Sequence, residues 1–93
     1  MTEQRWQDVL QLLGQQKATD QLDQVLGLLL SHDERQSLGG RLAVIRALLD
    51  GELSQRQISA QLEVSIATIT RASNNLKTMT DAERDELAAR LQR

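Results

Sequence analysis

The chain has 93 residues and a formal net charge of −2, with no proline, no cysteine and one aromatic residue, Trp6. This length fits one domain, and the lack of cysteine excludes disulfides and thiolate metal sites. A single histidine, His32, cannot make a metal cluster with familiar ligand spacing. No charged-then-apolar leader and no long apolar span is visible, so we expect a cytoplasmic protein without a membrane segment.

The hydrophobic residues recur at helical spacing and predict six helices packed around leucine, isoleucine, valine and alanine. The first covers about residues 2–13. The second covers about residues 20–30 and is apolar around much of its circumference, so we expect it to be buried between two subunits. A partner subunit would help a chain this short, because a small monomer buries little surface.

Helix starts are marked by a serine or threonine with Glu or Gln three residues later, the pattern of a capping box. It occurs at Ser31, Ser54 and Thr80, where we expect the third, fourth and sixth helices to begin. The fifth helix is expected to start near Ser65. Gly51 fits the carboxyl-terminal cap of the third helix.

Residues 54–71 read SQRQISAQLEVSIATITR and predict two short helices joined by a turn of about three residues. Small, hydrogen-bonding side chains open the second helix, as a reader of the DNA major groove requires, because bulky residues there would block the base edges. An ordinary helical hairpin is the alternative, but it gives no packing reason for these small polar residues. We therefore predict a helix-turn-helix. The side chains expected to face inward are Ile58, Leu62, Val64 and Ile69.

The predicted turn departs from the usual pattern at one position. Such turns normally contain glycine, which accepts a positive φ without strain. Glu63 stands there instead, and a glutamate in that conformation costs roughly 1 kcal/mol. Either the turn differs slightly or the protein tolerates the strain.

Charge is unevenly distributed along the chain. Residues 54–77 carry Arg56, Arg71 and Lys77 against Glu63, whereas acidic residues gather at 33–34, 50–52 and 81–86. A negatively charged chain attracts DNA weakly, so specificity would depend more on direct contacts and geometry.

Three stretches resemble the family of bacterial tryptophan operon repressors: LLLSHDER, GGRLAVIRALLDGELSQRQI and SIATITRASNNLK, which lie between about Leu28 and Lys77. EQRWQ near the amino terminus is a weaker match. The resemblance implies an all-α, six-helix intertwined homodimer. Residues 1–53 and 78–93 would form the dimerisation core, and residues 54–77 the helix-turn-helix reading head.

The resemblance also implies a function. The protein would be a repressor that binds L-tryptophan as corepressor and then a palindromic operator in double-stranded DNA, shutting down tryptophan biosynthesis genes. The operator half-sites would lie about one DNA turn apart, as for other helix-turn-helix dimers.

A tryptophan site follows from the resemblance as well. Arg41 and Arg71 would sandwich the indole ring, and Arg71 could pair with the ligand carboxylate. Backbone carbonyls at the end of the second helix would meet the ligand ammonium. The implied ligand-binding set is Leu28, Leu30, Ser31, Arg41, Ile45, Arg71, Ala72 and Asn75.

Two members of this set depart from the family pattern near the ligand, and a third is a replacement that keeps the same functional group. Ala72 replaces a glycine close to the ligand, and its methyl group could narrow the pocket. Asn75 replaces a serine near the ligand amine. Ser31 stands where the family often has threonine and keeps the hydroxyl.

The DNA-binding set combines contacts to bases with contacts to phosphates. Arg56 is the best candidate for a base contact, since arginine can address guanine O6 and N7 together. Ser59 stands where the family often has lysine, which removes a basic contact and should slightly reduce salt sensitivity. The full set is Gln55, Arg56, Ser59, Ser65, Ile66, Ala67, Thr68, Thr70 and Lys77.

The sequence contains no combination of nucleophile, base and orienting group, so we do not expect an enzyme or a catalytic cofactor. Two alternatives remain open. One is a helix-turn-helix regulator with another small-molecule effector or none. The other is a protein-interaction module that uses the same helices as a partner surface.

Overall fold

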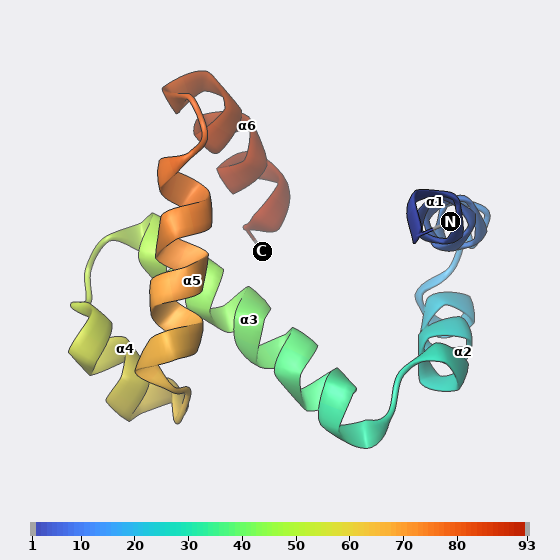
Figure 1. Ribbon diagram of the computed structural model, residues 1–93, viewed down its shortest axis with the longest axis horizontal. Coiled ribbons are helices and arrows are strands. Elements are labelled where there is room, and N and C mark those ends of the chain that lie inside the picture. Colours follow the sequence, from blue (N-terminus) through green and yellow to red (C-terminus); the bar gives the residue numbers. More distant parts are fainter. Residues whose placement is uncertain (1, 93) are drawn as a thin grey trace. The chain divides into compact units, whose positions relative to one another are not determined.

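The computed structural model describes residues 2–92 and places six helices and no strand in them, which confirms the predicted all-α class. The helices are α1 (Thr2–Gly14), α2 (Thr19–Leu29), α3 (His32–Asp50), α4 (Gln55–Leu62), α5 (Ile66–Lys77) and α6 (Asp81–Leu91), shown in Figure 1. They form two compact units, Met1–Arg35 and Gln36–Arg93. None of these helices has both the length and the apolar character needed to cross a membrane.

The first unit contains α1, α2 and the start of α3. Helix α2 begins without a serine or threonine cap, and the side-chain oxygen of Gln21 accepts a hydrogen bond of 3.0 Å from the backbone N–H of Lys17 instead. No residue of α2 is buried, and Leu28 is 86% exposed. The apolar surface of α2 is therefore not covered within the chain, and its burial between subunits stays a prediction.

The three predicted capping boxes are confirmed. At each one the cap hydroxyl accepts a bond of 3.1 Å from the backbone N–H three residues later, and that residue's side chain accepts from the backbone N–H of the cap. The pairs are Ser31 with Glu34, Ser54 with Gln57, and Thr80 with Glu83. Gly51 has φ +71 just after α3, as expected of a helix-ending glycine.

The core of the second unit is a small apolar cluster. Val44 of α3, Ile58 of α4 and Ile69 of α5 are completely buried, and Ala72 of α5 joins them. Burial of each large side chain contributes about 1.5–3 kcal/mol. Helix α5 lies across α3 at this cluster (Figure 1), so the predicted reading helix is anchored on the longest helix of the fold.

Helix α6 is held to the same unit partly by polar contacts. Arg46 of α3 donates a bond of 2.5 Å from Nε to the carbonyl of Leu91. Arg84 of α6 donates a bond of 3.0 Å from Nη2 to the carbonyl of Leu76 in the last turn of α5. Each arginine donates to a carbonyl in the last turn of a helix, where fewer partners from the same helix remain.

Candidate functional site

The helix-turn-helix consists of α4, the turn 63–65 and α5. Ile58 and Ile69 are completely buried between the helices, and Val64 packs half-buried against them, as predicted. The prediction for Leu62 was wrong, because its side chain is 37% exposed. Leu62 is the last residue of α4 and lies at the edge of the core. Beyond the end of a helix, the helical spacing of apolar residues no longer predicts which side chains are buried.

The turn has the strained geometry that the sequence suggested. Glu63 caps α4 in the left-handed region, with φ 55 and ψ 44, and is the one non-glycine residue of the described chain with positive φ. The protein thus tolerates the strain. The Ser59 hydroxyl donates a hydrogen bond of 2.8 Å to the carbonyl of Val64, immediately after the strained residue.

The amino end of α5 is open to solvent. Ser65 caps it by accepting a bond of 3.2 Å from the backbone N–H of Thr68, and the two hydroxyl oxygens lie 3.0 Å apart. Ile66 is 50% exposed, and Ala67 and Thr70 are exposed as well. A helix end with small, uncovered side chains can enter a major groove.

The other predicted DNA-binding residues differ in exposure and in whether their polar groups already have a hydrogen-bond partner. Arg56, in the first turn of α4, and Lys77, in the last turn of α5, are exposed, and no ion pair occupies either within residues 2–92. Gln55 is half-buried. Ser59 is also half-buried, and its hydroxyl is occupied by Val64. A contact from Ser59 to DNA would therefore compete with an existing hydrogen bond.

Arg41 lines a pocket of about 440 Å³ in the second unit. The pocket is formed by Gln36, Ser37, Gly40 and Arg41 of α3 together with Leu62, Glu63, Val64 and Thr68 of the helix-turn-helix. Both a candidate ligand residue and a candidate DNA residue, Arg41 and Thr68, thus border one hollow. The sequence did not indicate that the turn itself would form a wall of this hollow.

The remaining ligand candidates of the second unit differ in how accessible they are. Arg71 and Asn75 are exposed on α5, and the Asn75 carbonyl accepts a bond of 2.7 Å from the Thr78 hydroxyl. Ile45 is half-buried against the core, and Ala72 is 8% exposed within it. The methyl group of Ala72 therefore packs between helices, whereas the sequence predicted only that it would narrow the ligand pocket.

Three ligand candidates belong to the first unit. Leu28 is exposed, and Leu30 is half-buried with its backbone N–H donating to the Leu26 carbonyl. Ser31 is fully engaged in its capping box with Glu34, the function that its sequence pattern predicted. Hydrogen bonds from the Ser31 backbone and then from its side chain lower the pKa of Glu34 below the ordinary value of 4.5.

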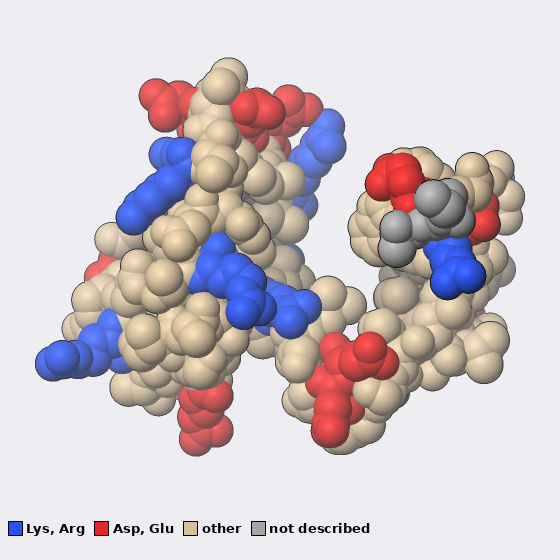
Figure 2. Space-filling view, in the orientation of Figure 1, with Lys and Arg blue, Asp and Glu red and all other residues tan. Residues whose placement is uncertain are grey.

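Charge separates over the second unit. Lys and Arg side chains lie over the middle of α5, where it passes α3, whereas Asp and Glu gather at the start of α6 (Figure 2). On α6, Arg84 pairs with Asp81 at 3.8 Å and Arg90 with Glu86 at 2.6 Å. The helix-turn-helix itself carries Arg56, Arg71 and Lys77 against Glu63, the local surplus of positive charge that the sequence shows, while α6 carries both signs of charge.

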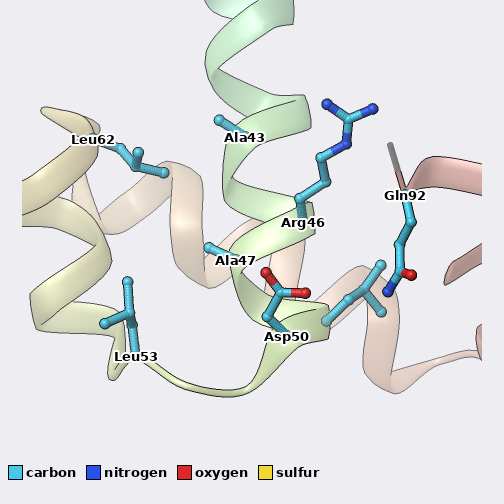
Figure 3. Close-up of a pocket in the computed structure, with 8 residues that line it drawn as sticks. Ala43, Arg46, Ala47, Asp50, Leu53, Leu62 and Gln92 are labelled. Carbon is cyan, nitrogen blue, oxygen red and sulfur yellow. The ribbon is translucent and has the colours of Figure 1, made fainter.

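A larger hollow of about 540 Å³ contains none of the predicted site residues. Leu53 and Leu62 border it from the side of α4, and Arg46 and Asp50 from α3, with Gln92 opposite (Figure 3). Its lining mixes leucine and alanine with one acid and one base. The sequence contains no motif that predicts this hollow, because its lining residues come close together only when the chain after α6 lies beside α3.

Comparisons with known proteins identify the family of the chain. The family described as Trp repressor protein matches residues 4–92. Proteins named Trp operon repressor homolog are similar to the chain: that of Vibrio parahaemolyticus is 48% identical over 88% of this chain and 80% of its own. Those of Vibrio campbellii and Vibrio cholerae are 45% and 48% identical, over 94% and 89% of this chain and 87% and 81% of theirs. The chain therefore belongs to the Trp repressor protein family, whose members are DNA-binding transcriptional regulators and not enzymes.

Proposed function

We propose that the protein is a tryptophan-responsive transcriptional repressor, which binds L-tryptophan as corepressor and then a palindromic operator that controls tryptophan biosynthesis genes. The observation that carries the proposal is the open amino end of α5, held by the buried pair Ile58 and Ile69, in a chain of this family. The names of the similar proteins refer to the trp operon and favour tryptophan over another effector.

For the ligand, we assign the two faces of the indole ring to Arg41 and Arg71. Both guanidinium groups are exposed and form no ion pair within the described part of the chain, so they can stack on an aromatic ring without losing a partner. Each stacking contact contributes about 0.5–2 kcal/mol. Isothermal calorimetry with L-tryptophan tests this assignment: Arg41→Ala should weaken binding about 3- to 30-fold.

For the DNA, we assign base contacts to Arg56 and to the open end of α5, with Ile66, Ala67 and Thr70. Gln55, Thr68 and Lys77 would touch phosphates. A duplex selected from a random pool by the protein with L-tryptophan present should contain two half-sites about one turn apart. Binding of that duplex should fall sharply when L-tryptophan is omitted.

A homodimer is part of the proposal. Apolar side chains remain exposed on several helices, including Trp6 of α1, Leu28 of α2 and Leu38 of α3, while only a small cluster is buried in the second unit. Large exposed apolar area on a small chain favours association. A dimer would also supply two reading heads for a palindromic site.

The shared pocket suggests how ligand and DNA binding are coupled. Residues of the turn and Thr68 of α5 line the same hollow as Arg41, so a ligand there would contact both α3 and the reading head, whereas Arg71 does not line it. L-tryptophan can act as a switch only if it binds the DNA-competent arrangement better than the other. A cytoplasmic location, where an operator is accessible, is part of the same proposal.

An Arg56→Ala variant separates this proposal from a protein-interaction module. Arg56 is exposed and lies outside the core, so the variant should keep its fold and oligomeric state but lose specific binding of the selected duplex. Unchanged binding would argue for an interaction surface. If calorimetry showed no binding of L-tryptophan, the protein would instead be a DNA-binding regulator with another effector or with none.

A further inference from the structure

The turn of the helix-turn-helix is held from within α4. The hydroxyl of Ser59 donates a hydrogen bond of 2.8 Å to the carbonyl of Val64, five residues later and beyond the end of the helix. Serine hydroxyls inside helices commonly bond back to the carbonyl of the preceding turn. The forward bond of Ser59 instead connects the body of α4 to the chain that leads into α5.

This bond lies next to the most strained residue of the second unit. Glu63 has φ 55 and ψ 44, a left-handed conformation that glycine adopts freely and other residues adopt at a cost. Its side chain is exposed and takes part in no hydrogen bond or ion pair between described residues. Glu63 therefore does not stabilise the turn by itself, and the neighbouring residues must do so.

We propose that Ser59 is a positioning residue for the reading helix: its bond to Val64 compensates for a non-glycine residue at position 63 and fixes where α5 begins. Ser65 follows Val64 directly and caps α5 through the backbone N–H of Thr68. A fixed Val64 carbonyl therefore also fixes the cap. The part of this proposal that concerns DNA rests on the proposed function, whereas the part that concerns the turn does not.

The chemistry of the hydroxyl group supports a positioning role over a direct phosphate contact. A serine hydroxyl has one proton to donate, and phosphate oxygens only accept hydrogen bonds. The proton of Ser59 is already donated to Val64. A bond from Ser59 to the DNA backbone would leave the Val64 carbonyl without this partner.

A set of variants tests the proposal by measuring the effect of Ser59→Ala in three backgrounds. These are the natural chain, Glu63→Gly, which removes the strain, and Glu63→Gln, which removes the charge and keeps the strain. Affinity for the selected duplex should fall about fivefold in the natural chain and with Glu63→Gln, the loss that one net hydrogen bond implies. With Glu63→Gly the loss should be less than about twofold, because glycine needs no help at this φ.

Two controls separate positioning from general stability. Ser73→Ala, on a half-buried serine of α5, should leave affinity unchanged in all backgrounds. All affinities are measured where circular dichroism shows every variant fully folded, so a purely structural role of Ser59 would give no change in affinity and would overturn the proposal. An equal loss in all three backgrounds would show that the effect of Ser59 does not depend on the strain at position 63 and would also overturn the proposal.

Amide hydrogen exchange of the free protein gives a second readout that needs no DNA. Ser59→Ala should speed exchange at Thr68 and Ile69, whose N–H groups bond to the Ser65 side chain and carbonyl, by about fivefold. The Glu63→Gly background should restore slow exchange. If the natural chain bound no duplex, the proposed function would fail, while the exchange rates would still decide whether Ser59 holds the turn. Unchanged exchange would refute that role.

Discussion

Arg84 of α6 donates a hydrogen bond of 3.0 Å to the carbonyl of Leu76, so the last turn of α5 is tied to the helix that follows it. Its Nε atom is buried without a hydrogen-bond partner among the described residues. The Leu76 carbonyl also accepts from the backbone N–H of Met79 at 3.2 Å. Arg84 therefore adds a second partner to a carbonyl that is already satisfied.

Replacement of Arg84 by methionine should lower the free energy of unfolding by at most about 1 kcal/mol, because one hydrogen bond is lost while the apolar stem is kept and a buried N–H without a partner is removed. Denaturation by urea measures the change. Arg90→Met is the matched control: its pair with Glu86 is exposed, and the loss should stay below about 0.5 kcal/mol. A larger effect at Arg90 than at Arg84 would contradict this account of how α6 is attached.

Two isoleucines on α5 should separate folding from DNA binding. Ile69→Ala removes a completely buried side chain and should cost about 2–5 kcal/mol of stability, enough to unfold much of a small domain. Ile66→Ala removes a half-exposed side chain and should change stability by less than about 1 kcal/mol, yet reduce affinity for the selected duplex. Thermal unfolding and duplex titration measure the two effects, and a stable Ile69→Ala protein would argue against the core described above.

Acid should weaken the start of α6 through Glu83. Hydrogen bonds from the Thr80 backbone and then from its side chain lower the pKa of Glu83 below the ordinary value of 4.5. Because the folded pKa is the lower one, the stabilisation is present above about pH 4.5 and is lost as pH falls through the folded pKa. Glu34 should act in the same direction at α3.

The chain offers its own control for this pH effect. Gln57 makes the same capping bond to the backbone N–H of Ser54 without an ionisable group. Glu83→Gln should therefore keep the cap and flatten the loss of stability that occurs as pH falls from about 4.5 through the folded pKa of Glu83. Urea titrations at several pH values measure it, and an unchanged slope for Glu83→Gln would count against the capping explanation.

Trp6 provides an optical test of the proposed dimer. It is the only aromatic residue and is 55% exposed in the single chain. Association should cover it, so its emission should shift to shorter wavelength as protein concentration rises, without added ligand. Leu38→Asp, on an exposed leucine of α3, should reduce the shift, whereas Gln61→Ala should not. A monomer mass in sedimentation at every concentration would refute the dimer.

Local signals in the sequence predicted most helix boundaries. Ser31, Ser54 and Thr80 were recognisable because a capping box needs only residues three apart, and Glu63 because the turn requires one residue in an unusual conformation. Helix α2 lacks such a cap, and its predicted start at about residue 20 differs by one residue from the observed start at Thr19.

Contacts between distant segments could not be predicted in the same way. The burial of Ala72 beside Val44, and the bond from Arg46 to the carbonyl of Leu91, depend on how α5 and α6 cross α3. The bond from Ser59 to the carbonyl of Val64 depends on the conformation of the turn, which residue types alone do not determine. Which residues touch tryptophan or DNA stays a prediction for the same reason, since a ligand can collect residues from segments far apart in the chain.

The left-handed turn at Glu63 also has a genetic consequence. Glutamate and glycine codons differ by one base, and the backbone at this position already has the shape that glycine adopts without strain. A single base change can therefore place glycine at position 63, where the backbone needs no rearrangement to accept it. One base change in the codon for residue 63 should therefore be enough to give a more stable helix-turn-helix.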